Sequence, residues 1–239
     1  LRSEQIKALQ NTTINCASDK KMIGQLAGGF LPYIFIAFGF IGCMYPAIDL
    51  FTGEKERGTL ETLLTVPVSR WKILVGKMLV VVSSGMLAAT CALLGLFISI
   101  EFLDLAANKE LLDVIHSVLT PTFIISMFAL LMPLVIFFAG VMIPIAIYAK
   151  SFKEAQSIIT PLNIVVVLPS MVGFFPGVAL DLNTVFIPVI NVVLATKELI
   201  AGTLSLSYFL SVFGIMCSLA FLAIAISYKQ FGKEANILN

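Results

Sequence analysis

Charged side chains are scarce in this chain. Of its 239 residues 12% are charged, where a soluble domain carries about 25%. Hydrophobic residues make up 59%, against roughly 45–50% in soluble domains. The apolar residues gather in runs long enough to cross a hydrocarbon core of about 30 Å. A soluble fold cannot hide that much apolar surface, so the composition indicates an integral membrane protein.

Cysteine and histidine are also rare. The four cysteines have irregular spacings and form no CxxC pair, which gives no support to a zinc site or a disulfide framework. A metalloprotease needs a cluster of ligands that His116, the one histidine, cannot supply. Ser83 and Ser84 have no neighbouring base to activate them. The sequence therefore argues against a membrane enzyme, and we expect no cofactor bound to this chain.

Two further patterns are missing. Gly76-Lys77 is not followed by Ser or Thr and belongs to no GxxxxGK[ST] motif, so the chain cannot bind ATP through a P-loop. Asp49, Glu101 and Lys150 lie at the ends of apolar segments, whereas carriers driven by an ion gradient usually place carboxylates at mid-membrane. A secondary transporter is therefore disfavoured, and a transporter driven by ATP would need a partner subunit.

Five apolar segments predict an all-α, polytopic membrane protein, because the bilayer offers no partners to unpaired backbone groups. Prolines at 161, 169 and 176 predict kinks or breaks in the fourth segment. Residues 185–196 are apolar but too short to span, and we expect a re-entrant or interfacial piece there. The predicted spans are 23–48, 73–100, 121–149, 158–180 and 207–228.

Lysine and arginine indicate the orientation, since cytoplasmic loops carry an excess of both. We expect the loops after the first and third spans, and the C-terminus, in the cytoplasm of a cell whose plasma membrane holds the protein. Residues 1–22 are then the end of an extracytoplasmic region, and one more span upstream would make six in the intact chain. Of the 15 basic residues, those expected inside are Lys55, Arg57, Arg70, Lys72, Lys77, Lys150, Lys153, Lys229 and Lys233.

The stretch GEKERGTLETLL, residues 53–64, interrupts the apolar runs. Its leucines recur at helical spacing with charges on other faces, and Thr52 is a suitable N-cap before two acidic residues. We therefore predict a short amphipathic cytoplasmic helix over 53–65. Its mixed charge suits a protein groove better than lipid headgroups, which favour a basic face. The residues expected to contact a partner are Glu54, Glu56, Arg57, Gly58, Thr59, Leu60, Glu61, Leu63 and Leu64.

These residues also carry a family resemblance. The run from Glu54 to Leu64, followed by Pro67, Ser69, Arg70 and Gly76-Lys77, resembles the signature of ABC-2 type permeases, the membrane subunits of one branch of ATP-binding-cassette exporters. Within that branch the chain is most similar to sodium-extruding permeases. Two other stretches fit the family, namely Pro188-Val189-Ile190-Asn191 and Phe231-Gly232-Lys233-Glu234.

The resemblance implies that 23–239 is one half of a dimeric membrane domain. It implies a coupling helix that fits a groove on a separate ATPase subunit, which would bind ATP and magnesium, while this chain itself is no enzyme. The partners would be that ATPase, a second permease subunit and membrane lipids, with no nucleic acid. Sodium is the expected cargo. The alternatives are export of lipids, drugs or peptides, or a scaffold that transports nothing.

A cation such as sodium would need several oxygen ligands, by analogy with other hard ions. Hydroxyls, amide oxygens and backbone freed by the prolines of the fourth span are the available sources. The alternative for each side chain is an ordinary hydrogen bond between helices. The candidates for a cargo path are Ser83, Ser84, Thr160, Asn163 and Asn191.

Overall fold

The computed structural model describes residues 19–59, 67–102 and 120–237, and it describes side chains within 28–59, 67–99 and 120–231. Every regular element in these ranges is helical, which confirms the all-α prediction. Five helices are long and apolar enough to cross a membrane, as the sequence predicts. They are built on α2 (Asp19–Ile48), α5 (Arg70–Phe102), α7 (Pro121–Tyr148), α8 (Phe152–Ser170) and α10 (Leu206–Ile237).

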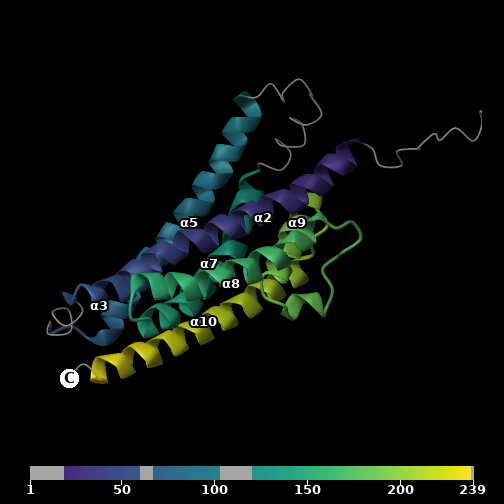
Figure 1. Cartoon of the computed structure of the whole chain (residues 1–239). Helices are drawn as coiled ribbons and strands as arrows, with labels where there is room; N and C mark the ends of the chain where they lie inside the picture. Colours follow the sequence, from purple (N-terminus) through teal and green to yellow (C-terminus); the bar gives the residue numbers. More distant parts are fainter. Residues whose placement is uncertain (1–18, 60–66, 103–119, 238–239) are drawn as a thin grey trace, which may run out of the picture.

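The helix α7 lies at the centre of the bundle. Two-thirds of its most apolar window, 67%, is buried, compared with 22% for each of α5, α8 and α10. Helix α10 packs along α7, while α2 packs against α5, α7 and α8. Helix α5 crosses α2 and then diverges from the other helices toward its own C-terminal end (Figure 1). Much of the surface of α5, α8 and α10 is therefore left for lipid or another subunit.

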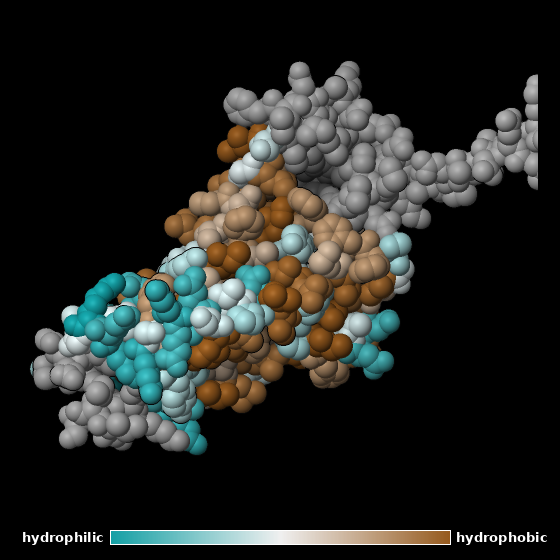
Figure 2. All heavy atoms as spheres, viewed as in Figure 1, coloured by the Kyte–Doolittle hydropathy of each residue, from teal (hydrophilic) through white to brown (hydrophobic). Residues whose placement is uncertain are grey.

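The two ends of the bundle differ in polarity. Hydrophilic residues gather around α3 (Glu54–Glu56) and the start of α5, and we call this the charged end (Figure 2). The C-terminal part of α10 reaches the same end, where the rings of Trp71 and Tyr228 lie 5.3 Å apart. At the far end lie η3 (Met171–Phe174), η4 (Thr184–Phe186) and α9 (Ile190–Ala201).

Small residues bring the helices close together at two crossings. A Cβ atom on Gly42 of α2 would lie 2.5 Å from the Cβ of Ala88 and 3.0 Å from the Cα of Gly85, both in α5. A Cβ atom on Gly140 of α7 would lie 2.6 Å from the Cβ of Ala223 in α10. Small side chains let the backbones of membrane helices approach in this way.

The predicted bounds of the fourth span, 158–180, are wrong at both ends. The helix begins at Phe152 because the Ser151 hydroxyl caps it, accepting a hydrogen bond from Glu154 N at 3.3 Å. Its α-helical part ends at Ser170, and a 3-10 turn continues it to Phe174. The other helices begin at 19, 70, 121 and 206, within four residues of the predicted starts. Three of them end at 48, 102 and 148, within two residues of the predictions, while α10 continues to 237, nine residues past the predicted end at 228.

The short piece predicted at 185–196 is a helix placed further along the chain. The single turn η4 occupies 184–186, and α9 runs over 190–201. Residues 187–189 separate the two, and Val189 adopts a φ of 73°. Helix α9 packs against α2 and ends at Ala201, and Gly202 caps it with a left-handed φ of 69°. At twelve residues it is not among the helices that could span.

Candidate functional site

The helix predicted over 53–65 does not begin where the sequence suggested. Helix α2 continues through a π-helical turn, η1 (Asp49–Gly53), directly into α3. Thr52 is therefore no N-cap, because the backbone around it is already helical. Its hydroxyl is buried and donates a hydrogen bond to the carbonyl oxygen of Ala146 at 2.6 Å. Residues 53–56 are thus the end of the first span, and Thr52 fixes that end to α7.

The helix stops at Gly58. This residue has a φ of 70°, in the left-handed region that glycine adopts without the steric penalty of a side chain. The turn is closed by a hydrogen bond from Gly58 N to Lys55 O at 3.1 Å. The chain is helical again at Thr59, whose hydroxyl donates to Glu54 O at 3.1 Å. Four of the predicted contact residues lie outside the described residues: Leu60, Glu61, Leu63 and Leu64.

Glu54 makes an ion pair inside the protein. Its Oε2 lies 2.5 Å from Nζ of Lys77 in α5, and the two side chains are 25% and 9% exposed. The Lys77 ammonium also donates to Leu50 O at 2.6 Å and lies 5.0 Å from the centre of the Phe51 ring. A charge this well enclosed is stable only when paired and hydrogen-bonded. Glu54 therefore joins the end of the first span to α5.

The next two side chains reach two other helices. Lys55 Nζ donates to Ile147 O at 3.2 Å, at the C-terminal end of α7 where carbonyl oxygens have no helical partner. Glu56 Oε2 accepts a hydrogen bond from Phe152 N at 3.0 Å, at the first residue of α8. Both contacts place a charge at the helix end whose dipole favours it.

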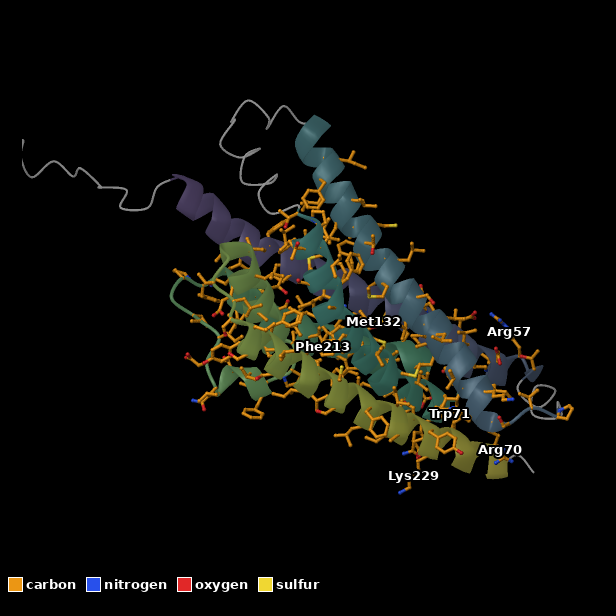
Figure 3. All side chains as sticks on the ribbon, turned by 180° about the vertical axis from the view of Figure 1, so that it is seen from behind. Arg57, Arg70, Trp71, Met132, Phe213 and Lys229 are labelled. Atoms are coloured by element: carbon orange, nitrogen blue, oxygen red, sulfur yellow. The ribbon has the colours of Figure 1, made fainter. Side chains whose placement is uncertain are left out.

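Arg57 completes the set by turning back along its own helix. Its guanidinium donates to Asp49 Oδ1 at 2.8 Å, and these two side chains are 65% and 49% exposed. Four consecutive charged residues, 54–57, thus contact four different elements: α5, α7, α8 and η1. We call them the charged tetrad. Arg57 lies at the charged end, together with Arg70, Trp71 and Lys229 (Figure 3).

The sequence did not identify the partners of the tetrad. Lys77 is among the few buried charged or polar residues, and its role was not anticipated. Both Lys77 and Asp49 could be recognised as charges at the ends of predicted spans, opposite in sign to the tetrad residues they contact. The acceptors in α7 and the donor in α8 are backbone groups, and the residue type does not indicate which backbone groups form such bonds.

The five candidates for a cargo path are spread over three helices. Ser83 is exposed on α5 and its hydroxyl donates to Leu79 O in the preceding turn. Thr160 is exposed on α8, while Asn163 on α8 and Ser84 on α5 are half-buried. Asn191 is buried and bonds locally: its Nδ2 donates to Val185 O at 2.9 Å, and its Oδ1 accepts from Val192 N at 2.7 Å. No hydrogen bond in the described part of the chain joins candidates of two helices.

Comparison with known proteins identifies the family. The family model described as "ABC-2 family transporter protein" matches residues 2–235. The chain is 32% identical over 221 residues to the ABC transporter permease protein NatB of Bacillus subtilis (strain 168), an alignment that covers 89% of this chain and 55% of NatB. It therefore spans about half the length of this relative, and no solved structure matches it significantly. The resemblance seen in the sequence is confirmed, and this multi-pass membrane chain belongs to the ABC-2 family of transporter proteins.

Proposed function

We propose that this chain is the membrane-spanning part of an exporter permease and that a separate ATPase subunit drives it through residues 54–64. The observation that carries the proposal is the charged tetrad. Each of its four side chains contacts a different element of the bundle, so a displacement of the turn at Gly58 would act on α2, α5, α7 and α8 together.

The contacts favour a division of labour within 54–64. Glu54, Lys55 and Glu56 have partners inside the bundle, and these hold the turn at a fixed position. The leucines at 60, 63 and 64 then contact the ATPase, because an apolar stripe suits a groove. Arg57 is more exposed than Glu54, the other tetrad residue in an ion pair, and it is next to the turn at Gly58. Arg57 is therefore suited to orient the ATPase subunit.

The same end of the molecule supports the orientation that we propose. Lys55, Arg57, Arg70, Lys72 and Lys77 belong to the charged end, and basic residues are in excess on the cytoplasmic side of membrane proteins. The tetrad and the C-terminus then face the ATPase in the cytoplasm. A second permease subunit completes the pathway, which accounts for the large exposed surface of the outer helices.

Sodium is the cargo we propose, on the strength of the resemblance to sodium-extruding permeases. The five candidate polar residues are spread over three helices, so within the described part of the chain they do not form an ion site together. A pathway formed with a second subunit would bring in further ligands. Lipids, drugs or peptides are the second choice of cargo, because the exposed apolar faces of α5 and α8 would suit such molecules.

The decisive experiment uses the intact permease, purified with candidate ATPases and reconstituted in vesicles. We expect ATP hydrolysis to be stimulated by sodium and accompanied by sodium transport. Stimulation by a lipid, drug or peptide instead would support the assignment as an exporter but show that sodium is not its cargo. A permease that binds no ATPase and transports none of these cargoes would be a scaffold, and the proposal would be wrong.

Docking can be tested separately. Leu60→Asp with Leu64→Asp puts two charges into an apolar groove, at a cost of several kcal/mol. We expect this variant to reach the membrane but to lose the ATPase during purification. Val68→Asp adds a charge at an exposed position nearby and serves as the control. A stoichiometric ATPase on the double variant would show that the leucines do not form the contact.

A further inference from the structure

The segment 175–189 at the far end has an unusual distribution of polarity. It contains no α-helix, yet large apolar side chains point out of the protein. Phe175 is 60% exposed, Leu182 74% and Phe186 69%. In a loop surrounded by water, such side chains would be covered and polar groups would be exposed.

Two charged side chains of α9 form hydrogen bonds with the backbone of this segment. Lys197 Nζ donates to the carbonyl oxygens of Phe175, at 2.8 Å, and Val178, at 3.4 Å. The Glu198 carboxylate accepts a hydrogen bond from Leu180 N at 2.8 Å. Burial lowers the pKa of Lys197, and the neighbouring Glu198 partly offsets that effect.

In the second half of the segment, one bond comes from α9 and two lie within the segment itself. Val185 O accepts from the buried Asn191 amide at 2.9 Å, and Val185 N donates to Asp181 O at 3.0 Å. The Thr184 hydroxyl accepts from Asp181 N at 2.8 Å. These bonds satisfy several backbone groups of the segment, and an unpaired polar group beside hydrocarbon costs several kcal/mol. The polar side chains of Asp181 and Asn183 are exposed between the apolar ones.

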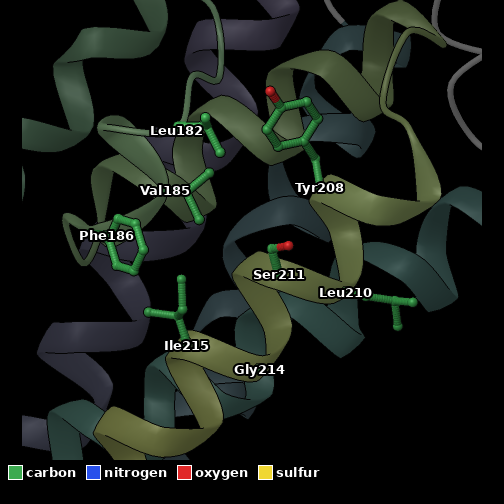
Figure 4. A pocket seen from close by; sticks show the side chains of 8 residues that line it. All are labelled: Leu182, Val185, Phe186, Tyr208, Leu210, Ser211, Gly214 and Ile215. Atoms are coloured by element: carbon green, nitrogen blue, oxygen red, sulfur yellow. The ribbon is translucent and has the colours of Figure 1, made fainter.

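A groove of about 330 Å³ separates this segment from α10 (Figure 4). Two hydroxyls line the groove from α10, those of Tyr208 and Ser211, and the Ser211 hydroxyl is already used, since it donates to Ser207 O at 2.8 Å. Gly214 leaves the floor open: a Cβ atom there would meet nothing within 4 Å. The remaining walls are mostly apolar and come from Leu182, Val185, Phe186, Tyr208 and Ile215.

We propose that the side chains of Phe175, Leu182 and Phe186 insert into the lipid at the far end of the protein, with the exposed Asp181 and Asn183 at the level of the headgroups, and that this groove binds an acyl chain of a membrane phospholipid. Leu210, which lines the groove, is an exposed apolar residue in the first turns of a membrane-spanning helix. The groove is therefore continuous with a surface that lies in the bilayer. Because the groove presents apolar side chains and its Ser211 hydroxyl is already bonded, it suits a hydrocarbon chain better than a polar ligand.

The test uses the intact permease in vesicles that contain a phospholipid with a photoreactive diazirine in the middle of one acyl chain. After illumination, crosslinked peptides are mapped by mass spectrometry. We expect crosslinks at 182–186 and at 208–215, at a yield comparable to that at Leu87 and Leu94 of α5, which are exposed apolar residues of another span. Labelling of α5 without labelling of these two stretches would mean that water or a second subunit covers the groove, and would overturn the proposal.

A pair of glycine variants tests the groove itself. Gly214→Leu fills the open floor, and since a filled space excludes an acyl chain, crosslinking at 208–215 should fall about tenfold. Gly95→Leu is the control, because a Cβ atom at Gly95 in α5 would also meet nothing within 4 Å. This variant should leave the labelling of 182–186 and of 208–215 unchanged. Unchanged crosslinking in Gly214→Leu would show that no lipid occupies the groove. None of these outcomes depends on the cargo or on the ATPase.

Discussion

Glu54 and Arg57, three residues apart at the charged end, each form an ion pair, but the surroundings of the two pairs differ. Glu54 and Lys77 are 25% and 9% exposed, and the lysine also binds a backbone carbonyl and lies over an aromatic ring. Arg57 and Asp49 are 65% and 49% exposed and share one contact. Breaking an enclosed pair leaves a charge without compensation, whereas water replaces an exposed partner. The pair of Glu54 and Lys77 should therefore contribute more to the stability of the charged end. The pair of Arg57 and Asp49 contributes less to stability and can take part in recognition of the ATPase.

The largest effect is expected from Glu54→Leu, which leaves the Lys77 ammonium without its carboxylate. We expect the free energy of unfolding to fall by about 2–3 kcal/mol, less than for a fully enclosed pair because Glu54 is partly exposed. Thermal denaturation of the purified protein in detergent measures the change. Adding Lys77→Met should restore most of the stability, since no charge is then left unpaired. A double variant as unstable as the single one would show that the pair is not the cause.

A smaller loss is expected from Thr52→Val, which keeps the shape of the side chain and removes the hydroxyl. The buried Ala146 carbonyl then loses a hydrogen bond, at a cost of about 1–2 kcal/mol. Thr160→Val, at an exposed position of α8, is the control and should change the denaturation midpoint little. Equal effects of the two variants would mean that Thr52 does not fix the first span to α7.

The turn that follows the charged tetrad, at Gly58, can be tested through a pair of glycines. Gly58→Ala forces a side chain into a left-handed conformation, which costs about 1–2 kcal/mol. Gly76→Ala is the control, because its Cβ would also meet nothing within 4 Å but its backbone is helical. We expect Gly58→Ala to reduce transport per ATP hydrolysed and Gly76→Ala to leave it unchanged. The same ratio in both variants would exclude a role for the turn in coupling.

The smallest effect on stability is expected from Arg57→Gln, at no more than about 0.5 kcal/mol, because its ion pair is exposed. Combined with Glu61→Gln, it should leave the ATPase bound but separate ATP hydrolysis from export. Cargo transport and phosphate release, measured in the same vesicles, would reveal this. Normal values of both would mean that these charges only face water, while release of the ATPase would mean that they provide affinity.

The extent of the membrane-spanning helices could largely be predicted, because hydropathy reports it directly. The ends were harder. Lys153 was assigned to a loop, but it lies in the first turn of the helix that Ser151 caps. Thr52 had the residue type of a cap, yet its helix simply continues. A cap depends on whether the preceding backbone stops being helical, and residue type alone does not reveal that.

The candidate site was predictable in composition but not in its contacts. The charges of 54–57 mark the site in the sequence, and their grouping predicted a functional segment. Their directions depend on packing: Glu54 points toward α5 and Glu56 toward α8 because of where those helices lie. The same holds for Asn191, whose amide is used within its own loop and helix. A polar residue in an apolar sequence has many possible partners until the helices are placed.

The π-helical turn η1 also has a consequence for how this chain can change length. Such a turn bonds each N–H to the carbonyl five residues back, and so holds one residue more than an α-helical turn. Loss of one residue from 49–53 would convert it to α-helix while residues 54–57 keep their directions. The same deletion in an uninterrupted α-helix such as α5 would rotate everything beyond it by about 100°. A related protein could therefore lose one residue at η1 and still direct the side chains that follow it toward the same partners, which it could not do after a deletion in α5.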